Sequence, residues 1–400
     1  MEMSSAESLF RYMTDTRRDL HRAPELTWEE CETAEWIRKQ LTGMEIPWRA
    51  FAETGTVATL TPEGDPGPHR AFRADMDALP IQEQTGVPYA SQIDGKMHAC
   101  GHDGHMAALL GTAHWFNQHL SELPGPVSFV FQPAEEGGHG ARRMLEEGAL
   151  EGVDEIYGWH NWPALPLGKA LCPDGTVMSG NGTFRITVSG EGGHASQPEE
   201  ARDPVLAAAA ITLNVQQIVS RRLPPQANAV LSVTSVDGRS STTIIPAQVV
   251  LEGSFRFSEP SLQSCLVAHL TEISQNTAAS YGVHADVEIF PRYGATVNHA
   301  DSAARYREAL EEEFGNEFDH TEVWTPLMAS EDFSYYLKSV PGAFAIIGMS
   351  ETTPDGETEF RTPCHSSTYQ FNDRVLLHVV RVFSRLAGIP GPQIFPAIET

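Results

Sequence analysis

In the first third of the chain, hydrophobic positions recur with two periods, which separate predicted helices from predicted strands. In residues 5–21, Leu9, Met13 and Leu20 lie near the 3.6-residue spacing of an amphipathic helix. The expected elements of this region are helices over 5–21, 28–41 and 105–120, and strands over 57–60, 71–74 and 127–131. Their alternation predicts an α/β domain with a mixed sheet.

A different pattern begins near residue 182. Four segments alternate apolar and polar residues, and two are helical, the first opening on Asp203-Pro204, a favourable cap and first-turn pair. The expected strands are 184–188, 228–236, 248–257 and 284–290, and the expected helices are 204–223 and 262–281. The order β-α-β-β-α-β is typical of a ferredoxin-like α+β module.

The α/β pattern resumes after this module, with helices expected over 302–314 and 374–386 and a strand over 343–348. The ferredoxin-like module is therefore interpreted as an insertion. We predict one α/β domain formed by residues 1–181 and 294–400 and an inserted domain formed by residues 182–293.

Composition narrows the classes of protein to consider. The 400 residues carry a formal net charge of −26, which argues against nucleic-acid and anionic-membrane partners, since both need a basic face. No apolar run approaches the ~20 residues that span a bilayer. The charge fits either an ordinary acidic surface or a halotolerant host. The five cysteines are scattered and no secretory signal is recognised, so a reducing cytoplasm is expected.

The densest chemistry lies in residues 97–105, which read Met-His-Ala-Cys-Gly-His-Asp-Gly-His. Thiolates, imidazoles and carboxylates are ligands of divalent transition metals. Cys100 and His102 flank a glycine here, and Asp103 is placed to orient an imidazole, as the partners of metal ligands do. His98 and His105 are weaker candidates that can support other ligands instead.

Two adjacent carboxylates follow the expected strand 127–131 and precede two glycines, so they are expected in a strand-end loop. Such a pair can divide its roles, one side chain binding a metal and the other taking a proton from water. His160 follows a short apolar strand, and His365 lies near the C-terminus. Five residues would be sufficient for two metal ions if one ligand is shared: Cys100, His102, Glu136, His160 and His365.

Several motifs resemble one family in their order and spacing. They are RADMDALP at 73–80, HACGHDGH at 98–105, QPAEEG at 132–137, GEGGHAS at 190–196, SEDF at 330–333 and the region around His365. The family is that of the co-catalytic metallo-aminoacylases and carboxypeptidases. The most similar branch holds hippurate hydrolases, N-acyl amino acid amidohydrolases and auxin-conjugate hydrolases. The resemblance runs from about residue 18 to residue 373.

The resemblance implies roles for individual residues. Glu135 is implied to be the general base, and Cys100 stands where relatives outside this branch have a bridging carboxylate. His194 resembles a residue that polarises the scissile carbonyl, often in the neighbouring subunit's site. The implied metal ligands are Cys100, His102, Glu136, His160 and His365, and the implied substrate-binding residues are Arg256, Thr243 and Asn228.

The resemblance also implies a cofactor, partners and a reaction. Two divalent metal ions are expected, Mn²⁺ or Zn²⁺, with Co²⁺ and Ni²⁺ also compatible with this donor set. The inserted domain is implied to be a lid or dimerisation domain, and the protein a homodimer or a dimer of dimers. The expected reaction is hydrolysis of the amide bond of an N-acyl amino acid of the acetyl or benzoyl type.

Three positions depart from the family pattern. Thr243 stands where Asn is usual before the Ile/Val-Pro pair, Cys364 precedes His365 where an apolar residue is usual, and Glu199 stands where His is common. Cys364 is interpreted as a packing residue, since free cysteines are often buried. The departures bear on substrate identity more than on reaction type.

Three other functions stay open on the sequence alone. A dipeptidase or carboxypeptidase would use the same mechanism on a peptide substrate. A cysteine hydrolase with Cys100 as nucleophile leaves Glu135, Glu136 and both isolated histidines without a role. A non-catalytic metal- or ligand-binding protein is disfavoured by the intact Glu135.

Overall fold

The chain forms two compact units, which the computed structural model describes over residues 5–64, 67–353 and 355–395. The first unit comprises Met1–Val177, Val297–Thr325 and Asp332–Thr400. The second comprises Met178–Thr296 and Pro326–Glu331. In the described residues, no helix is both long enough and apolar enough to cross a membrane.

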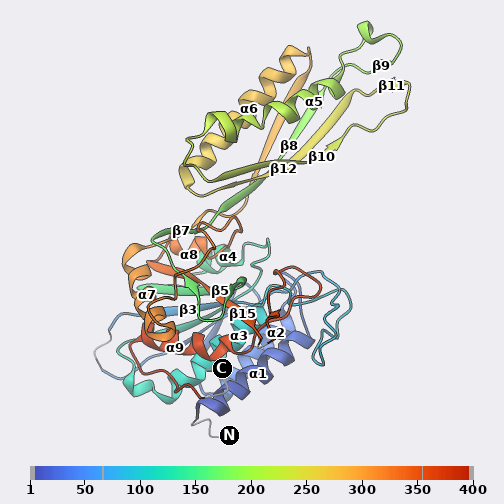
Figure 1. Cartoon of the computed structure of the whole chain (residues 1–400). Helices are drawn as coiled ribbons and strands as arrows, with labels where there is room; N and C mark the ends of the chain where they lie inside the picture. Colours follow the sequence, from blue (N-terminus) through green and yellow to red (C-terminus); the bar gives the residue numbers. More distant parts are fainter. Residues whose placement is uncertain (1–4, 65–66, 354, 396–400) are drawn as a thin grey trace. The chain divides into compact units, whose positions relative to one another are not determined.

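The first unit is built on an eight-stranded mixed sheet (Figure 1). Its strand order is β1-β2-β4-β3-β5-β15-β16, with β6 paired to β15. The four central strands, β4, β3, β5 and β15, run parallel to one another, whereas β1, β2, β6 and β16 pair antiparallel. The strands are β1 (Trp48–Phe51), β2 (Gly55–Leu60), β3 (Arg70–Asp75), β4 (Val127–Gln132), β5 (Glu155–Pro166), β6 (Ala170–Leu171), β15 (Gly342–Thr352) and β16 (Thr358–Glu359).

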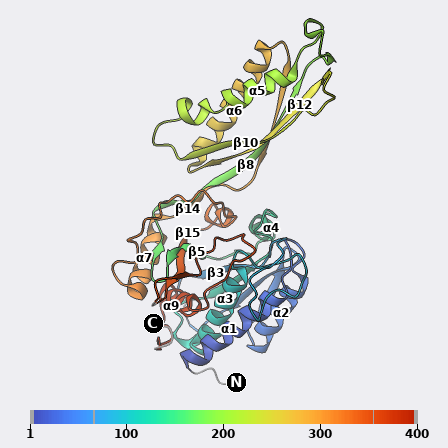
Figure 2. The ribbon, with the colours of Figure 1, turned by 45° about the vertical axis from the view of Figure 1, so that its right-hand side comes forward.

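Helices cover both faces of this sheet (Figures 1 and 2). Three of them, α1 (Ala6–Arg22), α3 (His102–Gln118) and α9 (Val375–Ala387), pack against one another on one face. On the other face, α4 (Gly140–Glu146) contacts both β4 and α8 (Ser334–Leu337). Two further helices pack at the sides: α2 (Cys31–Gly43) against β2, and α7 (Ala300–Phe314) against β15 and α9. The mixed-sheet α/β prediction is confirmed.

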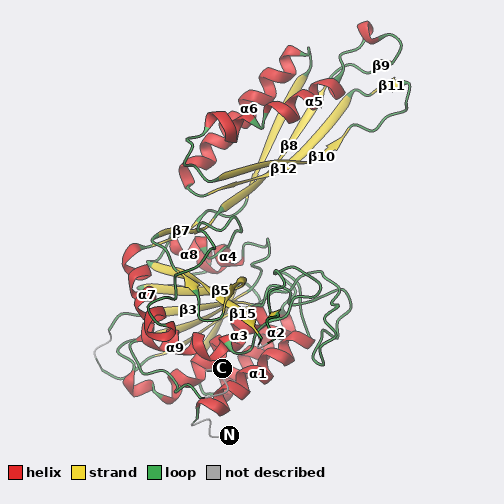
Figure 3. Ribbon diagram, viewed as in Figure 1, coloured by secondary structure: helices red, strands yellow, loops and turns green. Residues whose placement is uncertain are grey.

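The second unit is a four-stranded antiparallel sheet covered on one face by two helices (Figure 3). Its strand order is β10-β12-β8-β13. The helices pack on each other and on the sheet through a core that includes Phe184, Ile211, Leu251 and Leu270. This is the predicted ferredoxin-like module. Its elements are β8 (Gly180–Ser189), α5 (Pro204–Asn214), β10 (Ala229–Asp237), β12 (Gln248–Phe257), α6 (Pro260–Ser280) and β13 (His284–Pro291).

Short elements complete the fold. A two-stranded pair, β9 (Gly193–His194) with β11 (Ile244–Ile245), extends the second unit, and β7 (Gly175–Met178) pairs with β14 (Thr296–Asn298). Short 3₁₀ turns occur at Leu120–Glu122 and Pro198–Glu200, and a π-helical turn occurs at Ile218–Arg222.

Several predicted helices differ from the structure in their bounds; the helix expected over 105–120, for example, spans His102–Gln118. Two of the differences have a visible backbone cause. The helix expected over 28–41 begins only at Cys31, because Trp28 has a left-handed backbone with φ of 66°. The helix expected over 204–223 ends at Asn214, and its last residues form the π-helical turn instead. In both cases the hydrophobic period continues past the point where the backbone leaves the α-helical region.

Candidate metal centre

A left-handed glycine brings Cys100 and His102 together at the start of α3. Gly101 has φ of 94°, a conformation that glycine adopts at little cost. A Cβ atom at this position would lie 2.5 Å from Asn161 Oδ1 and 2.6 Å from Tyr369 OH. The tight turn therefore requires glycine, and it places both candidate ligands beside the carboxyl ends of the parallel strands, where open α/β sheets carry their sites.

The five residues expected as metal ligands lie close together in the first unit. They form two groups, Cys100 with His102 and His160, and Cys100 with Glu136 and His365. Within each group the candidate ligand atoms lie within 4.8 Å of one another. Cys100 belongs to both groups, which is the arrangement required if one ligand is shared between two ions.

Hydrogen bonds orient the two buried histidines of this cluster. His102 Nδ1 lies 2.8 Å from the backbone carbonyl of Asp77, and His160 Nδ1 lies 2.7 Å from the carbonyl of Asn161. Both rings therefore present Nε2 to the cluster. His102 Nε2 is buried and has no hydrogen-bond partner among the described residues, although it lies 3.5 Å from the carboxylate oxygen Oδ2 of Asp75. Since a buried nitrogen without a hydrogen bond is costly, this atom fits a metal ligand.

The electrostatics of the cluster favour a cation. Burial opposes the charged form of His102, but the carboxylates of Asp75 and Asp77 outweigh it and raise its pKa to about 10. The pKa of Cys100 is raised well above its usual value by a hydrogen bond with Cys364, by burial and by Glu136. The surroundings thus stabilise positive charge and oppose an isolated thiolate, and a divalent cation satisfies both tendencies.

Glu135 and Glu136 follow β4 in a loop, as predicted, and one carboxylate holds both of their backbones. Asp77 accepts hydrogen bonds from Glu135 N–H at Oδ1 (3.0 Å) and from Glu136 N–H at Oδ2 (2.9 Å). The two side chains make different contacts, although one carboxylate oxygen of each lies within 4.8 Å of the other and of a ring nitrogen of His102. Glu136 Oε1 lies 3.1 Å from His365 Nε2, whereas Glu135 Oε1 accepts a hydrogen bond from the backbone N–H of Asp332 at 3.3 Å. Adjacent residues therefore have different surroundings.

A buried ion-pair network centred on Arg73 lies next to the loop that carries Glu135 and Glu136. Arg73, which is fully buried in β3, donates hydrogen bonds to Asp75 (2.7 Å), Gln132 (2.8 Å) and Asp332 (3.0 Å). Asp332 also accepts from the backbone N–H of Ala141 at 3.0 Å. The sequence interpretation gave these residues no individual roles. The available signal was an arginine inside a short apolar strand, since a buried charge requires partners.

The structure corrects the role expected for Asp103. Its carboxylate accepts a hydrogen bond from His21 Nδ1 at 2.8 Å and lies 3.7 Å from Arg17 Nη1, so it does not orient a ligand histidine. Successive residues of a helix point about 100° apart, which directs Asp103 toward α1 while His102 faces the cluster. The group that orients His102 is Asp77.

The remaining histidines of this loop also differ in role. Both nitrogens of His105 are occupied, Nδ1 by Asp75 Oδ1 at 2.6 Å and Nε2 by Asn161 Oδ1 at 2.7 Å, so His105 is a supporting residue. His98 is buried, and neither of its nitrogens has a hydrogen-bond partner within the described ranges.

His160, expected after a strand, lies within β5. Cys364 Sγ lies 3.9 Å from the Cys100 carbonyl and is half-buried.

The candidate residues of the second unit form two pairs. His194 lies in β9, and Thr243 lies beside it, where its carbonyl accepts a hydrogen bond from Ala195 N–H at 3.0 Å. Arg256 lies near the end of β12, where its Nη1 donates to Ser330 Oγ at 2.9 Å. Asn228 precedes β10, and its carbonyl accepts from Ser258 N–H at 3.0 Å. The two pairs occupy opposite ends of the sheet formed by β10, β12 and β8.

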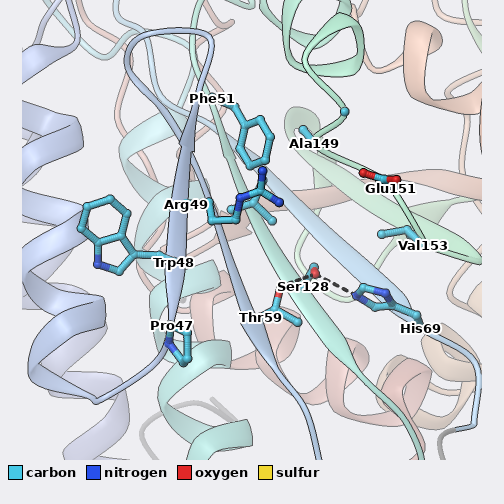
Figure 4. A pocket seen from close by; sticks show the side chains of 12 residues that line it. Pro47, Trp48, Arg49, Phe51, Thr59, His69, Ser128, Ala149, Glu151 and Val153 are labelled. Atoms are coloured by element: carbon cyan, nitrogen blue, oxygen red, sulfur yellow. Dashed lines mark hydrogen bonds between the residues drawn. The ribbon is translucent and has the colours of Figure 1, made fainter.

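A separate cavity of about 310 Å³ lies beside β1, β2 and β4 (Figure 4). His69 points toward Ser128 in this cavity, with Nε2 2.8 Å from the hydroxyl, and Ser128 Oγ lies 2.8 Å from Thr59 Oγ1. Ser128 is only 2% exposed and is the direct register partner of Thr59 across β2 and β4. We interpret the hydroxyl pair as a cross-strand contact that stabilises the sheet.

The buried thiol, imidazole and carboxylate groups at the strand ends, with a further carboxylate beside them, are the arrangement of a metal-dependent hydrolase. Comparison with known families agrees. The chain belongs to Peptidase family M20/M25/M40, whose sequence model matches residues 71–388. The resemblance found in the sequence motifs is thereby confirmed.

Individual relatives support the same assignment over nearly the whole chain. The chain is 38% identical to IAA-amino acid hydrolase ILR1-like 2 of Arabidopsis thaliana over 97% of this chain and 87% of that protein. It is also 38% identical to N-acetylcysteine deacetylase of Bacillus subtilis, over 94% and 96% of the two chains. The crystal structure of a dinuclear metal-binding M20 peptidase from Bacillus subtilis superposes with a TM-score of 0.80, at 33% identity and 95% and 98% coverage.

Proposed function

We propose that this protein hydrolyses the amide bond of N-acyl amino acids, releasing a carboxylic acid and a free amino acid. The observation that carries the proposal is a pair of adjacent carboxylates at the ligand cluster that make different contacts. Glu136 lies with the candidate ligands His365 and Cys100, whereas Glu135 accepts a hydrogen bond from Asp332 N–H and keeps an oxygen within 4.8 Å of Glu136 and His102, beside the cluster, where a base is needed. The names of the Arabidopsis and Bacillus relatives, a hydrolase of amino acid conjugates and a deacetylase, support the substrate class.

The proposed reaction uses the chain's own residues for proton transfer. Glu135 takes a proton from the attacking water, and the water oxygen forms a bond to the acyl carbon. Glu135 then delivers the proton to the amide nitrogen as the C–N bond breaks, so the acid keeps the water oxygen and the amine keeps the proton. Asp77 keeps this carboxylate in place through the Glu135 backbone. His194 is proposed to donate a hydrogen bond to the carbonyl oxygen as negative charge develops there, a type of contact worth ~10²–10³ in rate.

The proposed cofactor is a pair of divalent ions, Mn²⁺ or Zn²⁺, held by Cys100, His102, Glu136, His160 and His365. Such ions supply Lewis acidity toward the water and the scissile carbonyl when bound. The similarity to a dinuclear metal-binding peptidase of Bacillus subtilis and the sharing of Cys100 between two ligand groups support a pair. A thiolate ligand must stay reduced, and all five cysteines are free, which supports the cytoplasm as the proposed location.

Arg256 and Asn228 are proposed to hold the free carboxylate of the substrate, and Thr243 to contribute to recognition of the substrate. The test is amine release from N-acetyl and N-benzoyl amino acids and from dipeptides of the same residues. Faster cleavage of the acyl amino acids supports the proposal, and faster cleavage of the dipeptides assigns a dipeptidase instead. Glu135→Gln, expected to be inactive on every substrate, controls for contaminating hydrolases.

We further propose that the protein acts as a homodimer in which His194 serves the partner's site. His194 and Arg256 lie at opposite ends of a sheet whose central strand, β8, has 10 residues, which is ~30 Å. One small substrate cannot contact both residues of the same chain. Strand β10 lies at the edge of this sheet, and Leu206 and Leu213 of α5 are exposed, which supports an interface on this unit.

A mixing experiment tests this shared site. Glu135→Gln and His194→Ala are each expected to be inactive alone. In a mixed dimer, one site receives an intact Glu135 from one chain and an intact His194 from the other. Recovery of up to about a quarter of the wild-type rate after joint refolding supports the proposal, since half of the dimers are mixed and each has one complete site. Absence of recovery in verified mixed dimers overturns it.

A further inference from the structure

A strained residue immediately precedes the proposed general base. Ala134 has φ of 56°, a left-handed conformation that costs a residue with a side chain ~1 kcal/mol or more. Its backbone N–H donates a hydrogen bond of 2.9 Å to Glu30 Oε1. Glu30 lies at the start of α2, 104 residues away in the sequence. A distant carboxylate thus holds the Pro133–Ala134 peptide unit, one unit before the peptide that leads into Glu135.

Glu30 is fully buried, and both of its carboxylate oxygens accept hydrogen bonds. Its Oε1 atom also accepts from Trp28 N–H at 3.1 Å, and Oε2 accepts from Thr54 Oγ1 at 3.0 Å. In the described part of the chain, no Lys, Arg or His forms an ion pair with it, in contrast to Asp332 and Asp75, which pair with Arg73. Burial, together with the negative charge of Asp77, raises the pKa of Glu30 to about 7. A buried carboxyl without a cation costs stability, so Glu30 is not accounted for as one half of a stabilising ion pair.

The segment that carries Glu30 is docked closely onto the loop that carries Glu135. A Cβ atom on Gly138 would lie 2.5 Å from Thr27 Cγ2 and 2.7 Å from Trp28 Nε1. The Thr27 hydroxyl donates to Asp77 Oδ2 at 2.7 Å, the same oxygen that accepts from Glu136 N–H. Residues 27–30 therefore contact the base-carrying loop at Ala134 and lie against it at Gly138, and they also bind Asp77, the carboxylate that holds the loop.

Resting on the proposed function, we propose that Glu30 is a positioning residue for the hydrolysis: it fixes the Ala134 peptide in its left-handed conformation and thereby directs the Glu135 carboxylate. Asp77 fixes the next two N–H groups, so three successive peptide units are held by two side chains. Glu30 itself does not touch the reacting atoms. Without it, Ala134 is expected to relax, and a displacement of ~1 Å at a catalytic group costs ~10²-fold in rate.

Three substitutions separate positioning from a general structural role. Glu30→Met keeps the side-chain volume but removes the acceptor for Ala134 N–H. Glu30→Gln keeps an oxygen acceptor for Ala134 and can donate its amide to Thr54 Oγ1. Thr54→Val is the matched control, because it removes a buried hydrogen bond to Glu30 but leaves the bond to Ala134 intact. Glu30→Ala is made in parallel, so that a folding failure of the Met variant does not end the test.

The first readout is steady-state kinetics together with metal content. We expect Glu30→Met to lower kcat ~30–100-fold with KM within threefold and metal content unchanged. Glu30→Gln and Thr54→Val are expected to stay within threefold of wild-type kcat. The proposal is overturned if folded Glu30→Met keeps its kcat, or if Glu30→Gln and Thr54→Val lose as much activity as the Met variant.

The second readout does not depend on activity, so it distinguishes a failure of this inference from a failure of the proposed function. Hydrogen exchange of the Ala134 amide should be faster in folded Glu30→Met or Glu30→Ala and unchanged in Glu30→Gln and Thr54→Val. Unchanged exchange in the Met and Ala variants overturns the inference even if the protein is an active hydrolase. If exchange is faster but the protein cleaves none of the substrates, Glu30 still holds this loop. In that case only the proposed function is rejected.

Discussion

The Sγ atom of Cys100 lies 3.3 Å from Nε2 of His160. Each group is held in its neutral form. The pKa of the thiol is raised by its hydrogen bond with Cys364, by burial and by nearby carboxylates, and the pKa of the imidazole is lowered by burial and by His105. The pair is therefore a protonated thiol beside a neutral imidazole, whereas a metal ion requires the thiolate.

Metal binding is accordingly expected to release protons. At pH 7 the Cys100 thiol carries its proton because its pKa is raised, and this proton must leave when the thiolate binds a cation. Calorimetric titration of the apoprotein with Zn²⁺ in two buffers of different ionisation enthalpy measures the release. We expect about two protons per chain, one from the thiol and one from the His102 imidazolium, whose pKa is about 10, and weaker apparent affinity as pH falls. Release that is no smaller in Cys100→Ser than in wild type would contradict the role of Cys100.

Glu135→Gln and Glu136→Gln are expected to differ although the residues are adjacent. Loss of the base lowers kcat by ~10²–10⁴ and leaves the metal content intact. Loss of a ligand lowers the metal content itself, because Glu136 lies with Cys100 and His365. Kinetics and elemental analysis of dialysed protein distinguish the two variants. Equal metal loss in both would mean that the roles have not been divided as proposed.

Arg73 is expected to be essential for stability. Arg73→Met leaves Asp75 and Asp332 buried without their cation, and breaking a buried pair in this way costs about 3–5 kcal/mol in unfolding free energy. Arg185→Met removes an ion pair with Glu252 in which the arginine side chain is 47% exposed and screened by solvent, and should change the unfolding free energy far less. Urea unfolding of both variants measures the contrast, and similar small losses would argue against the network.

His21 is expected to make stability depend on pH. Burial alone would lower its pKa, but Asp103 and Glu83 outweigh this and raise it to about 9. Since the folded pKa exceeds the unfolded value of about 6.5, the protonated ring stabilises the fold fully below pH 6.5, and this contribution is lost as pH rises through 9. The shift corresponds to about 3 kcal/mol.

The measurement is the unfolding free energy of wild type and His21→Gln between pH 6 and pH 10. The difference between the two proteins should be largest at pH 6 and should shrink toward pH 10. A difference that is constant across this range would show that His21 contributes through packing alone.

The sequence predicts elements best where they are long and regularly periodic. The strand expected over 248–257 has the same bounds in the structure, and the helix expected over 5–21 differs by one residue at each end. Trp28 shows the limit, because its side chain continues a helical period while its backbone is held left-handed beside the base-carrying loop. A hydrophobic pattern reports side-chain burial and does not report such a backbone constraint.

The candidate ligands could be named from the sequence because their residue types are chemically distinctive. The residues that orient them could not, because they act through backbone atoms or over long sequence separations. Asp77 holds His102 through its own carbonyl, and Glu30 reaches Ala134 across 104 residues. Asp103 shows the converse, since adjacency to His102 in the sequence places it on another side of the helix.

We propose that a metal pair on this cluster supports amide hydrolysis with Glu135 as base. The decisive measurement is to strip the protein with a chelator and follow amine release from N-acetyl and N-benzoyl amino acids while Mn²⁺ or Zn²⁺ is added back. We predict no activity in the stripped protein and recovery that saturates near two ions per chain, with no recovery in Glu135→Gln. Hydrolysis that survives complete removal of metal and is abolished by alkylation of Cys100 would contradict the account and assign a cysteine nucleophile.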